Sequence, residues 1–430
     1  MTLADEQDDQ EEDDEKQSLF EEIQAAFPLL MAWLYRHKDF TYESMTDEEV
    51  QSFVRKVSDY FDHAVDTSIR QVPMAEVSVQ RLKESNYVFS GIKVFHELNE
   101  AFPSMLDDNN ELRPFEDFLN DVQKVNNTYN GSYLKTEYNF ARQSSLSAAR
   151  WKQFEKDGDR YNLQYRTAYD DRVRTSHRKL EGITLPPSSK FWNDYFPPNG
   201  WNCRCTVVQV RKDKYPESDE QKAIDLGSQA TAGRHQEMFK FNPGKAMTTF
   251  PAYNAYTIRK CKNCKYNGTL KLAADIPDNE LCGVCKLYKQ LGRPSAKTIR
   301  KLAKHLQGKT IIHKDFELPI TISGATIKEW GNQPFKHYYE KNRILLRIEE
   351  FMKQTKYIGA IRNENNWSHI FEASVYNDDA WVVVREYDWG DVILHSISDG
   401  LGDYLEKNPP KKNKVAKRPI QSELQSEAVS

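Results

Sequence analysis

Regular secondary structure cannot continue through residues 183–203, where prolines and a glycine interrupt a series of aromatic residues. Proline fixes the backbone φ angle and has no amide hydrogen to donate, so closely spaced prolines end helices and central strands. The interrupting residues are Pro186, Pro187, Pro197, Pro198 and Gly200, and the aromatics are Phe191, Trp192, Tyr195, Phe196 and Trp201. We therefore expect a rigid, loop-rich lobe here, within a chain of 430 residues that is long enough for about three folded units.

Helical patterns dominate the first third of the chain. Residues 46–49 form a capping-box pattern, and apolar residues then recur every three or four positions from Val50 to Ala64. This pattern predicts a helix of about 22 residues. Tyr133 to Phe154 gives a second long helix that ends near Asp157 and Gly158. We assign residues 18–160 to a helical region whose apolar stripes pack in a core.

The net charge of −4 hides a strong segregation of acidic and basic residues. Acidic residues crowd the start of the chain, where only Lys16 opposes them, so we expect residues 1–17 to be disordered. Residues 406–430 combine lysines with prolines and predict a basic, disordered tail. Residues 142–214 hold 15 Lys or Arg against 8 Asp or Glu. This excess suits nucleic acid, although a solvated face explains it as well.

The six cysteines fall into three close pairs. The motifs CKNC and CGVC are separated by 17 residues, the spacing at which two tight turns present four thiolates to one zinc ion. Their cysteines are Cys261, Cys264, Cys282 and Cys285. Two redox dithiols, or chance, are the alternatives. We expect a zinc knuckle over residues 258–292, after a connector at 216–257. Its zinc would be structural rather than catalytic, because a closed four-cysteine site has no position for water.

Helix and strand patterns alternate after the knuckle. A short basic helix at 296–306 and a second helix at 339–356 accompany four expected strands, at 318–322, 369–376, 381–386 and 392–397. Turn residues at 377–379 and 388–390 join the last three strands and indicate an antiparallel meander. The sequence thus predicts a multidomain α+β protein that ends in a small antiparallel α+β domain at 310–405.

No segment is expected to enter a membrane. The longest apolar run, Phe27 to Tyr35, is too short to span a bilayer, and it follows an acidic stretch, whereas a signal peptide needs a basic one. We expect a protein that is made and folded in cytoplasm.

Residues 163–210 read LQYRTAYDDRVRTSHRKLEGITLPPSSKFWNDYFPPNGWNCRCTVVQV. This stretch resembles the signature segment of the Mu F-like minor head proteins of tailed phages and prophages, and the resemblance extends over residues 100–215 with its core at 161–215. It implies a virion component that acts in head morphogenesis, associates with the portal and other head proteins, and in some relatives aids DNA packaging or delivery. The helical region 18–160 would then face the portal, and assembly would take place in the cytoplasm of the bacterial host.

The signature segment offers two sets of candidate binding residues. Its arginines suit phosphates of DNA or carboxylates of a partner protein; they are Arg166, Arg172, Arg174, Arg178 and Arg204. His177, Cys203 and Cys205 would ligate a second zinc ion if one more donor is present. Some relatives have a cysteine pair near the start of this segment, where this chain has residues 169–171, so Asp170 or Asp171 would have to substitute. The alternative is a buried turn with reduced thiols.

Residues 318–403 more distantly resemble the small nuclease-like domains found behind Mu F-like segments, which are related to barnase, EndoU and colicin-type toxins. That resemblance implies RNA cleavage without a metal, by a base, an acid and phosphate-binding cations. The candidates are His395, His337, His369, Glu329, Lys328 and Arg385. Glu329 stands where related domains have a histidine, so it serves as the base or the domain is inactive. The chain is then a head protein, a toxin-like RNase that uses the head segment as a packaging tag, or both; a cellular zinc-ribbon protein is the remaining alternative.

Overall fold

The structure is a computed structural model that describes residues 3–37, 40–109, 111–233, 236–252, 254–257 and 278–411, with side chains described from residue 10 onward except those of 278–282. The chain divides into two compact units, Met1–Arg293 (unit 1) and Pro294–Ser430 (unit 2). The segments 18–160, 161–215 and 216–257, which we expected as successive regions, therefore all belong to unit 1. Unit 2 begins earlier than the predicted domain at 310–405.

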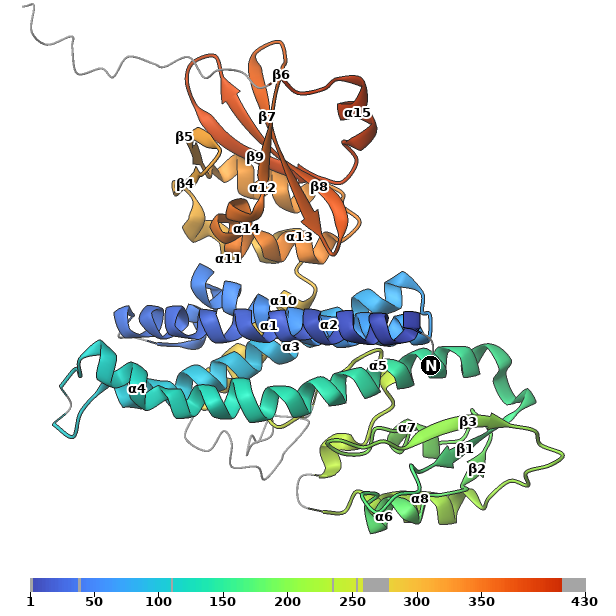
Figure 1. The fold of residues 1–430 in the computed structure, drawn as a ribbon. Coiled ribbons are helices and arrows are strands. Elements are labelled where there is room, and N and C mark those ends of the chain that lie inside the picture. The colour runs from blue at the N-terminus through green and yellow to red at the C-terminus, as the bar shows by residue number, and fades with distance from the viewer. Residues whose placement is uncertain are drawn as a thin grey trace, which may run out of the picture. The chain divides into compact units, whose positions relative to one another are not determined.

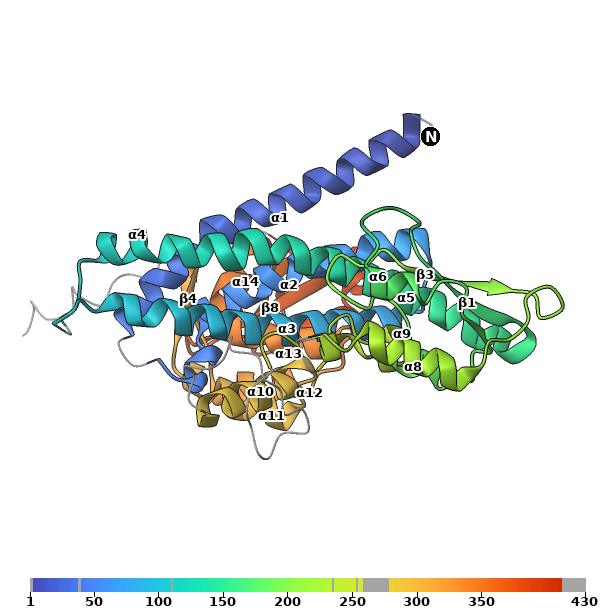
Figure 2. The ribbon, with the colours of Figure 1, turned by 90° about the horizontal axis from the view of Figure 1, so that it is seen from below.

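Long helices form the first part of unit 1 (Figures 1 and 2). They are α1 (Leu3–Arg36), α2 (Glu48–Gln71), α3 (Glu76–Ala101), α4 (Phe115–Asn126) and α5 (Leu134–Asp157), and the π-helical turn η3 (Asn127–Tyr133) joins α4 to α5. The two helices predicted from apolar spacing are confirmed as α2 and α5. The predicted cap of α2 is wrong: Asp47 precedes the helix, and the side chain of Thr41 instead caps the 3₁₀ helix η1 (Tyr42–Thr46).

The acidic start of the chain is helical, so the prediction of disorder is wrong for its described part. Arg70 at the end of α2 contacts both Glu12 and Glu15, and the ammonium of Lys16 lies 4.8 Å from the centre of the Tyr138 ring. Acidic side chains near a helix N-terminus also interact favourably with the helix dipole. Partners on neighbouring helices thus offset the self-repulsion on which the prediction rested.

The loop-rich lobe is confirmed between α5 and residue 230. Strand β1 (Asn162–Arg166) pairs antiparallel with β2 (Thr184–Leu185) on one side and β3 (Thr206–Val210) on the other. Three helices complete the lobe: α6 (Thr175–Arg178), α7 (Phe191–Asp194) and α8 (Glu220–Ala230). Its core combines Trp192 and Phe196 of the lobe with Trp151 of α5.

The segment expected as a connector packs into unit 1. Besides α8 it contains η5 (Gln236–Phe239) and α9 (Pro243–Ala246), and the Phe250 ring stacks on Phe89 of α3 at 3.6 Å between centroids. Gly244 lies so close to Trp151 that a Cβ atom would come within 2.3 Å of it. The segment predicted as a connector is thus partly helical, and its small and aromatic residues fill the joint between α3, α5 and the lobe. Helix α10 (Asp278–Gly292) then packs along α3.

Unit 2 is a six-stranded sheet with helices beside it (Figure 1). The sheet order is β4-β5-β9-β8-β7-β6. The strands are β4 (Thr310–His313), β5 (Phe316–Thr321), β6 (Lys356–Arg362), β7 (Asn366–Val375), β8 (Asp378–Tyr387) and β9 (Val392–Ser398). The helices are α11 (Ala296–Leu302), η7 (Ala303–Leu306), α12 (Gly324–Asn332), α13 (Tyr338–Ile344), η8 (Leu345–Arg347), α14 (Ile348–Gln354) and α15 (Gly402–Lys407).

The predicted meander is confirmed as β7, β8 and β9, but the sheet is mixed rather than antiparallel. Strand β5 pairs parallel with β9, and β4 and β6 extend the two edges. The helix predicted at 339–356 is broken near Arg347, whose φ of −129° is not helical. The start of the predicted basic tail is also ordered, since Lys407 ends α15 and Lys411 pairs with Ala360 of β6. Residues 412–430 lie outside the described residues.

None of the described helices combines the length and the apolar character that crossing a bilayer requires.

A buried polar cluster lies between α3, η3 and α5 in unit 1. The fully buried Lys93 ammonium lies 2.9 Å from a carboxylate oxygen of Glu137, which also accepts a hydrogen bond from the Tyr256 hydroxyl. One turn further along α3, Glu97 accepts a hydrogen bond from the Asn130 amide. Burial raises the pKa of Glu97 to about 8. Lys93 and Glu137 therefore form an ion pair beside a Glu97 that is protonated at neutral pH.

This cluster predicts that unit 1 loses stability as the pH rises. Unfolded Glu97 ionises near the ordinary glutamate pKa of 4.5, whereas folded Glu97 keeps its proton up to about 8, so its contribution is present below pH 4.5 and is lost as the pH rises through 8. Glu97→Gln, which keeps the hydrogen-bond acceptor, should flatten the fall in melting temperature between pH 5 and pH 8. The exposed Glu116→Gln is the matched control. An unchanged pH profile in Glu97→Gln would contradict the assignment.

Candidate functional site

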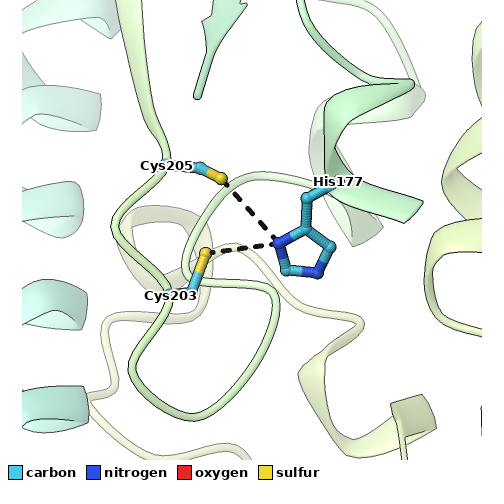
Figure 3. Close-up of side chains that lie close together, drawn as sticks. All are labelled: His177, Cys203 and Cys205. Carbon is cyan, nitrogen blue, oxygen red and sulfur yellow. Dashed lines mark hydrogen bonds between the residues drawn. The ribbon is translucent and has the colours of Figure 1, made fainter. Parts of the chain in front are cut away.

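Three of the predicted ligands meet inside the lobe (Figure 3). The Nδ1 atom of His177 on α6 lies 3.7 Å from the sulfur of Cys203 and 3.8 Å from that of Cys205, and all three side chains are buried. Cys203 and Cys205 are alternate residues of the segment that leads into β3, and both point toward His177 (Figure 3). Arg204 between them is exposed and binds Asp170. The C-x-C spacing and the short helix thus bring the three donors together.

The cluster fits zinc in donor type and in separation. Zn–S and Zn–N bonds of about 2.3 and 2.0 Å in a tetrahedron place sulfur and nitrogen about 3.6 Å apart, close to the two distances here. Hydrogen bonds from Cys205 and His177 also lower the pKa of the Cys203 thiol, although burial opposes this. His177, Cys203 and Cys205 would hold the metal, and one coordination position remains for a fourth donor.

Neither Asp170 nor Asp171, the residues predicted to supply a fourth donor, belongs to the cluster. The carboxylate of Asp170 is bound by the guanidinium of Arg204, which lowers the pKa of Asp170 to about 2, and Asp171 is exposed. Among the described residues, the donors that lie together at this site are His177, Cys203 and Cys205. The Tyr–Asp–Asp stretch therefore closes the lobe by an ion pair rather than by a metal bond.

Most of the predicted four-cysteine site lies outside the described residues. Cys261, Cys264 and the side chain of Cys282 are not described, so the ligand set stays a prediction. The second motif is not a tight turn, because Cys282 and Cys285 belong to helix α10. Gly283 of this motif allows close packing, since a Cβ atom there would lie 2.4 Å from the Tyr42 ring.

The five arginines mainly hold the lobe together. Arg204 donates to both carboxylate oxygens of Asp170, and Arg178 donates to the Asp170 backbone carbonyl at 3.1 Å. Arg174 donates to the Trp201 carbonyl at 2.8 Å, and Arg166 lies 3.4 Å from Glu181. Arg172 is largely open, with 83% of its side chain exposed at 3.8 Å from Asp170. The partner-binding role stays a prediction, and Arg172 is accessible for it.

In unit 2, three of the six predicted catalytic residues line one pocket. Arg385 of β8, His395 of β9 and Glu329 of α12 surround a volume of about 190 Å³, together with Ser323, Thr326 and Tyr387. Burial and the charge of Arg385 lower the pKa of His395, which the charge of Glu329 raises. The Nε atom of Arg385 is buried, and among the described residues it has no hydrogen-bond partner.

The other three candidates lie elsewhere in unit 2. Ser368 of β7 is opposite Arg385, so the next residue, His369, faces the other side of the sheet, where it contacts Glu386 and Tyr357 at 2.9 Å each. His337 contacts Asp378 at 2.5 Å, and Lys328 is exposed on α12 outside the pocket. The sequence reasoning missed Tyr387 and Thr326 of the pocket. The strand alternation that carries Arg385 also carries Tyr387 and was the available signal.

Comparison with known proteins finds that part of unit 1, from α4 to β3, is similar to Mu F-like proteins. Residues 113–208 match the family described as Phage Mu protein F like protein, which confirms the resemblance of the signature motif. Residues 293–395 match Large polyvalent protein-associated domain 3, so the nuclease relationship of unit 2 stays a prediction. No solved structure matches the chain.

Three relatives share parts of the sequence. The chain is 37% identical over 75 residues to the putative capsid assembly protein F of Escherichia phage Mu, covering 17% of each protein. It is 32% identical over 94 residues to the Mu-like prophage FluMu F protein of Haemophilus influenzae, covering 20% of this chain and 23% of that one. An uncharacterized protein of Methanocaldococcus jannaschii is 32% identical over 96 residues, covering 22% and 15%. The chain thus spans less than a quarter of the length of each.

We expect freshly purified, reduced protein to contain zinc in the lobe. Cys203→Ser should remove one equivalent of zinc per chain and loosen the lobe, because binding free energy at such sites is also folding free energy. If the four-cysteine site also binds, a second equivalent will be present and Cys261→Ser will remove it. Elemental analysis of both variants checks this. Protein without metal whose lobe is equally stable with Cys203→Ser would contradict the zinc assignment and leave a buried turn with reduced thiols.

Proposed function

We propose that this chain is a phage or prophage head protein that acts in capsid assembly. The observation that carries the proposal is the match of residues 113–208 to the Mu F-like family, whose relatives include a putative capsid assembly protein. The matched residues form α5 and most of the lobe, so the similarity covers a packed structural element rather than a loop motif.

The contacts of the signature motif support a role as a rigid part of an assembly. The Asn199 amide oxygen accepts a hydrogen bond from the Tyr165 hydroxyl at 2.9 Å, and the ion pair of Asp170 with Arg204 ties the start of the motif to its end. These side chains are buried in, or tied to, the lobe itself. A motif used in this way fixes a shape for a partner to bind, whereas a catalytic motif would leave reactive groups open to a substrate.

The partner in this proposal is the portal or another head protein, and the lobe binds it through exposed basic side chains such as Arg172. Contact with packaged DNA through the same side chains is the alternative. The two differ in salt dependence, because DNA binding releases counterions and weakens steeply as salt rises.

The assembly role is tested by comparing heads made with and without this gene product by cryo-microscopy. We expect heads formed without it to be defective in assembly or packaging, and the protein to copurify with heads made in its presence. Heads that assemble, package and inject normally without it would contradict the proposal.

The buried side-chain amide of Asn199 tests whether the lobe is needed for incorporation into heads. Asn199→Ala removes the amide oxygen that accepts a hydrogen bond from the Tyr165 hydroxyl inside the lobe and should destabilise the lobe by about 1–3 kcal/mol. We expect less of this variant in purified heads, measured by quantitative immunoblotting. The exposed Asp171→Asn is the control and should be incorporated normally. Normal incorporation of a demonstrably destabilised Asn199→Ala protein would show that the lobe is not the assembly element.

The pocket of unit 2 favours a second function, cleavage of RNA. A lowered pKa leaves His395 neutral at pH 7, so its imidazole can accept the proton of a ribose 2′-hydroxyl. The 2′ oxygen then attacks phosphorus, the bond to the 5′ oxygen breaks, and that oxygen takes a proton from water, which leaves a cyclic phosphate. Arg385 would bind the phosphate, and the Glu329 carboxylate would stabilise the imidazolium.

The full-length protein should therefore cleave RNA in the absence of added metal. His395→Gln should lower the rate by about 10²–10⁴, the usual contribution of a general base. Wild-type activity should fall as the pH drops through the pKa of His395, because a protonated imidazole cannot accept a proton. His305→Gln changes an exposed histidine of unit 2 and should have no effect. Intact ribosomal, transfer and messenger RNA after incubation with folded protein would remove the enzyme proposal without affecting the assembly role.

A further inference from the structure

An exposed tryptophan stands beside the pocket of unit 2. Trp389, at the turn between β8 and β9, is 68% exposed. It is the one tryptophan among the large hydrophobic residues that are exposed in the described part of the chain. Its ring stacks on Tyr387, with 4.5 Å between the ring centroids and 18° between the planes. Tyr387 thus covers one face of the indole, and the rest of the Trp389 ring is exposed to solvent.

Several contacts hold this ring in place. The indole N–H donates to the Asp391 carboxylate at 2.8 Å, and the Gly390 amide donates to the Tyr387 carbonyl at 2.8 Å. Gly390 has a φ of 108°, a conformation that favours glycine. The neighbouring Asp388 is neutralised by Arg362, whose guanidinium donates to both of its carboxylate oxygens. The tryptophan is therefore presented to solvent by an ordered turn.

The stacked pair continues directly into the pocket. Tyr387 lines it, and Arg385 lies two residues earlier on the same face of β8, about 7 Å along the strand. The guanidinium of Arg385 offers charged donors to an anion, and its Nε has no hydrogen-bond partner among the described residues. Ser323 and Thr326, whose N–H groups donate to each other's hydroxyls at the start of α12, also line the pocket. The turn, the tyrosine and the guanidinium thus form one continuous surface.

The volume of the pocket decides which part of a ligand enters it. About 190 Å³ is below the 300–1,000 Å³ of typical small-molecule sites, so a phosphate and part of a sugar fit, whereas a whole nucleotide does not. The base of a bound nucleotide must lie outside, and the stacked pair of the exposed Trp389 and the half-buried Tyr387 is the adjacent surface.

We propose that Trp389 and Tyr387 form a stacking platform for one base of a single-stranded nucleic acid whose phosphate is bound by Arg385. The inference rests on the RNA-cleaving function proposed above and adds the strandedness of its substrate. Aromatic side chains stack on any unpaired base, whereas a base within a duplex has no free face. The platform selects single strands without selecting sequence.

Fluorescence anisotropy with the full-length protein tests the platform separately from cleavage. The probes are fluorescein-labelled 12-residue single strands of DNA and of 2′-O-methyl RNA, neither of which has the 2′-hydroxyl that cleavage needs, and the matching duplex. We expect both single strands to bind and Trp389→Ala to weaken their binding about tenfold or more. Trp389→Phe should restore part of the affinity. Tyr404→Ala, which removes another exposed aromatic residue of unit 2, should leave it unchanged.

Two results would overturn the platform. One is equal binding of single strands by the wild type and Trp389→Ala, and the other is no binding of single strands by the wild type at low salt. If Trp389→Ala binds oligonucleotides normally but is lost from heads, Trp389 is a protein contact and the proposal is wrong. Binding that depends on Trp389 in a protein that cleaves no RNA would retain the platform and reject only the enzyme.

Discussion

Helix α5 is the element on which the rest of unit 1 depends, because its two ends belong to two different cores. Near its start, Glu137 pairs with Lys93 inside the helical bundle. Near its end, the buried Trp151 packs edge to face on Phe196 of the lobe, with ring centroids 5.0 Å apart. A rigid helix of 24 residues therefore fixes the lobe relative to the bundle. The Mu F-like match includes this helix together with the lobe, as expected if the joint and not the motif alone is what relatives share.

How much of the fold the sequence predicts depends on whether local or distant contacts decide it. Apolar spacing predicts α2 and α5, and prolines predict the lobe, because both signals act within a few residues. The acidic half of α1 is predicted wrongly because its contacts with Arg70 and Tyr138 come from residues far along the chain. The parallel pairing of β5 with β9 is missed for the same reason, since Thr321 and Ile393 are 72 positions apart (393 − 321). Local patterns carry no information about such partners.

The candidate sites also differ in whether local or distant contacts decide them. The C-x-C spacing places Cys203 and Cys205 on one side of the chain, and the signature motif supplies His177, so this cluster could be predicted. The arginines could be counted but not assigned, because Asp170 and the Trp201 carbonyl engage Arg204, Arg178 and Arg174 within the lobe. In unit 2 the residue types pointed to a set of histidines, yet the fold places His395 in the pocket of Arg385, whereas His369, paired with Val384, faces the other side of the sheet. Register is set by pairing between strands and not by composition.

The partners of the three histidines distinguish a structural role from a chemical one. His369 contacts Glu386 and Tyr357, and His337 contacts Asp378, so each holds two parts of unit 2 together. His395 instead shares a pocket with Arg385, whose Nε is buried without a hydrogen-bond partner among the described residues. A buried donor left unpaired costs stability, on the order of 1–3 kcal/mol. The Nε of Arg300 and the Oδ1 of Asn342 are also buried without a partner among the described residues of unit 2, but neither residue lines this pocket. Under the proposed function, an anionic phosphate oxygen supplies the acceptor that Arg385 lacks.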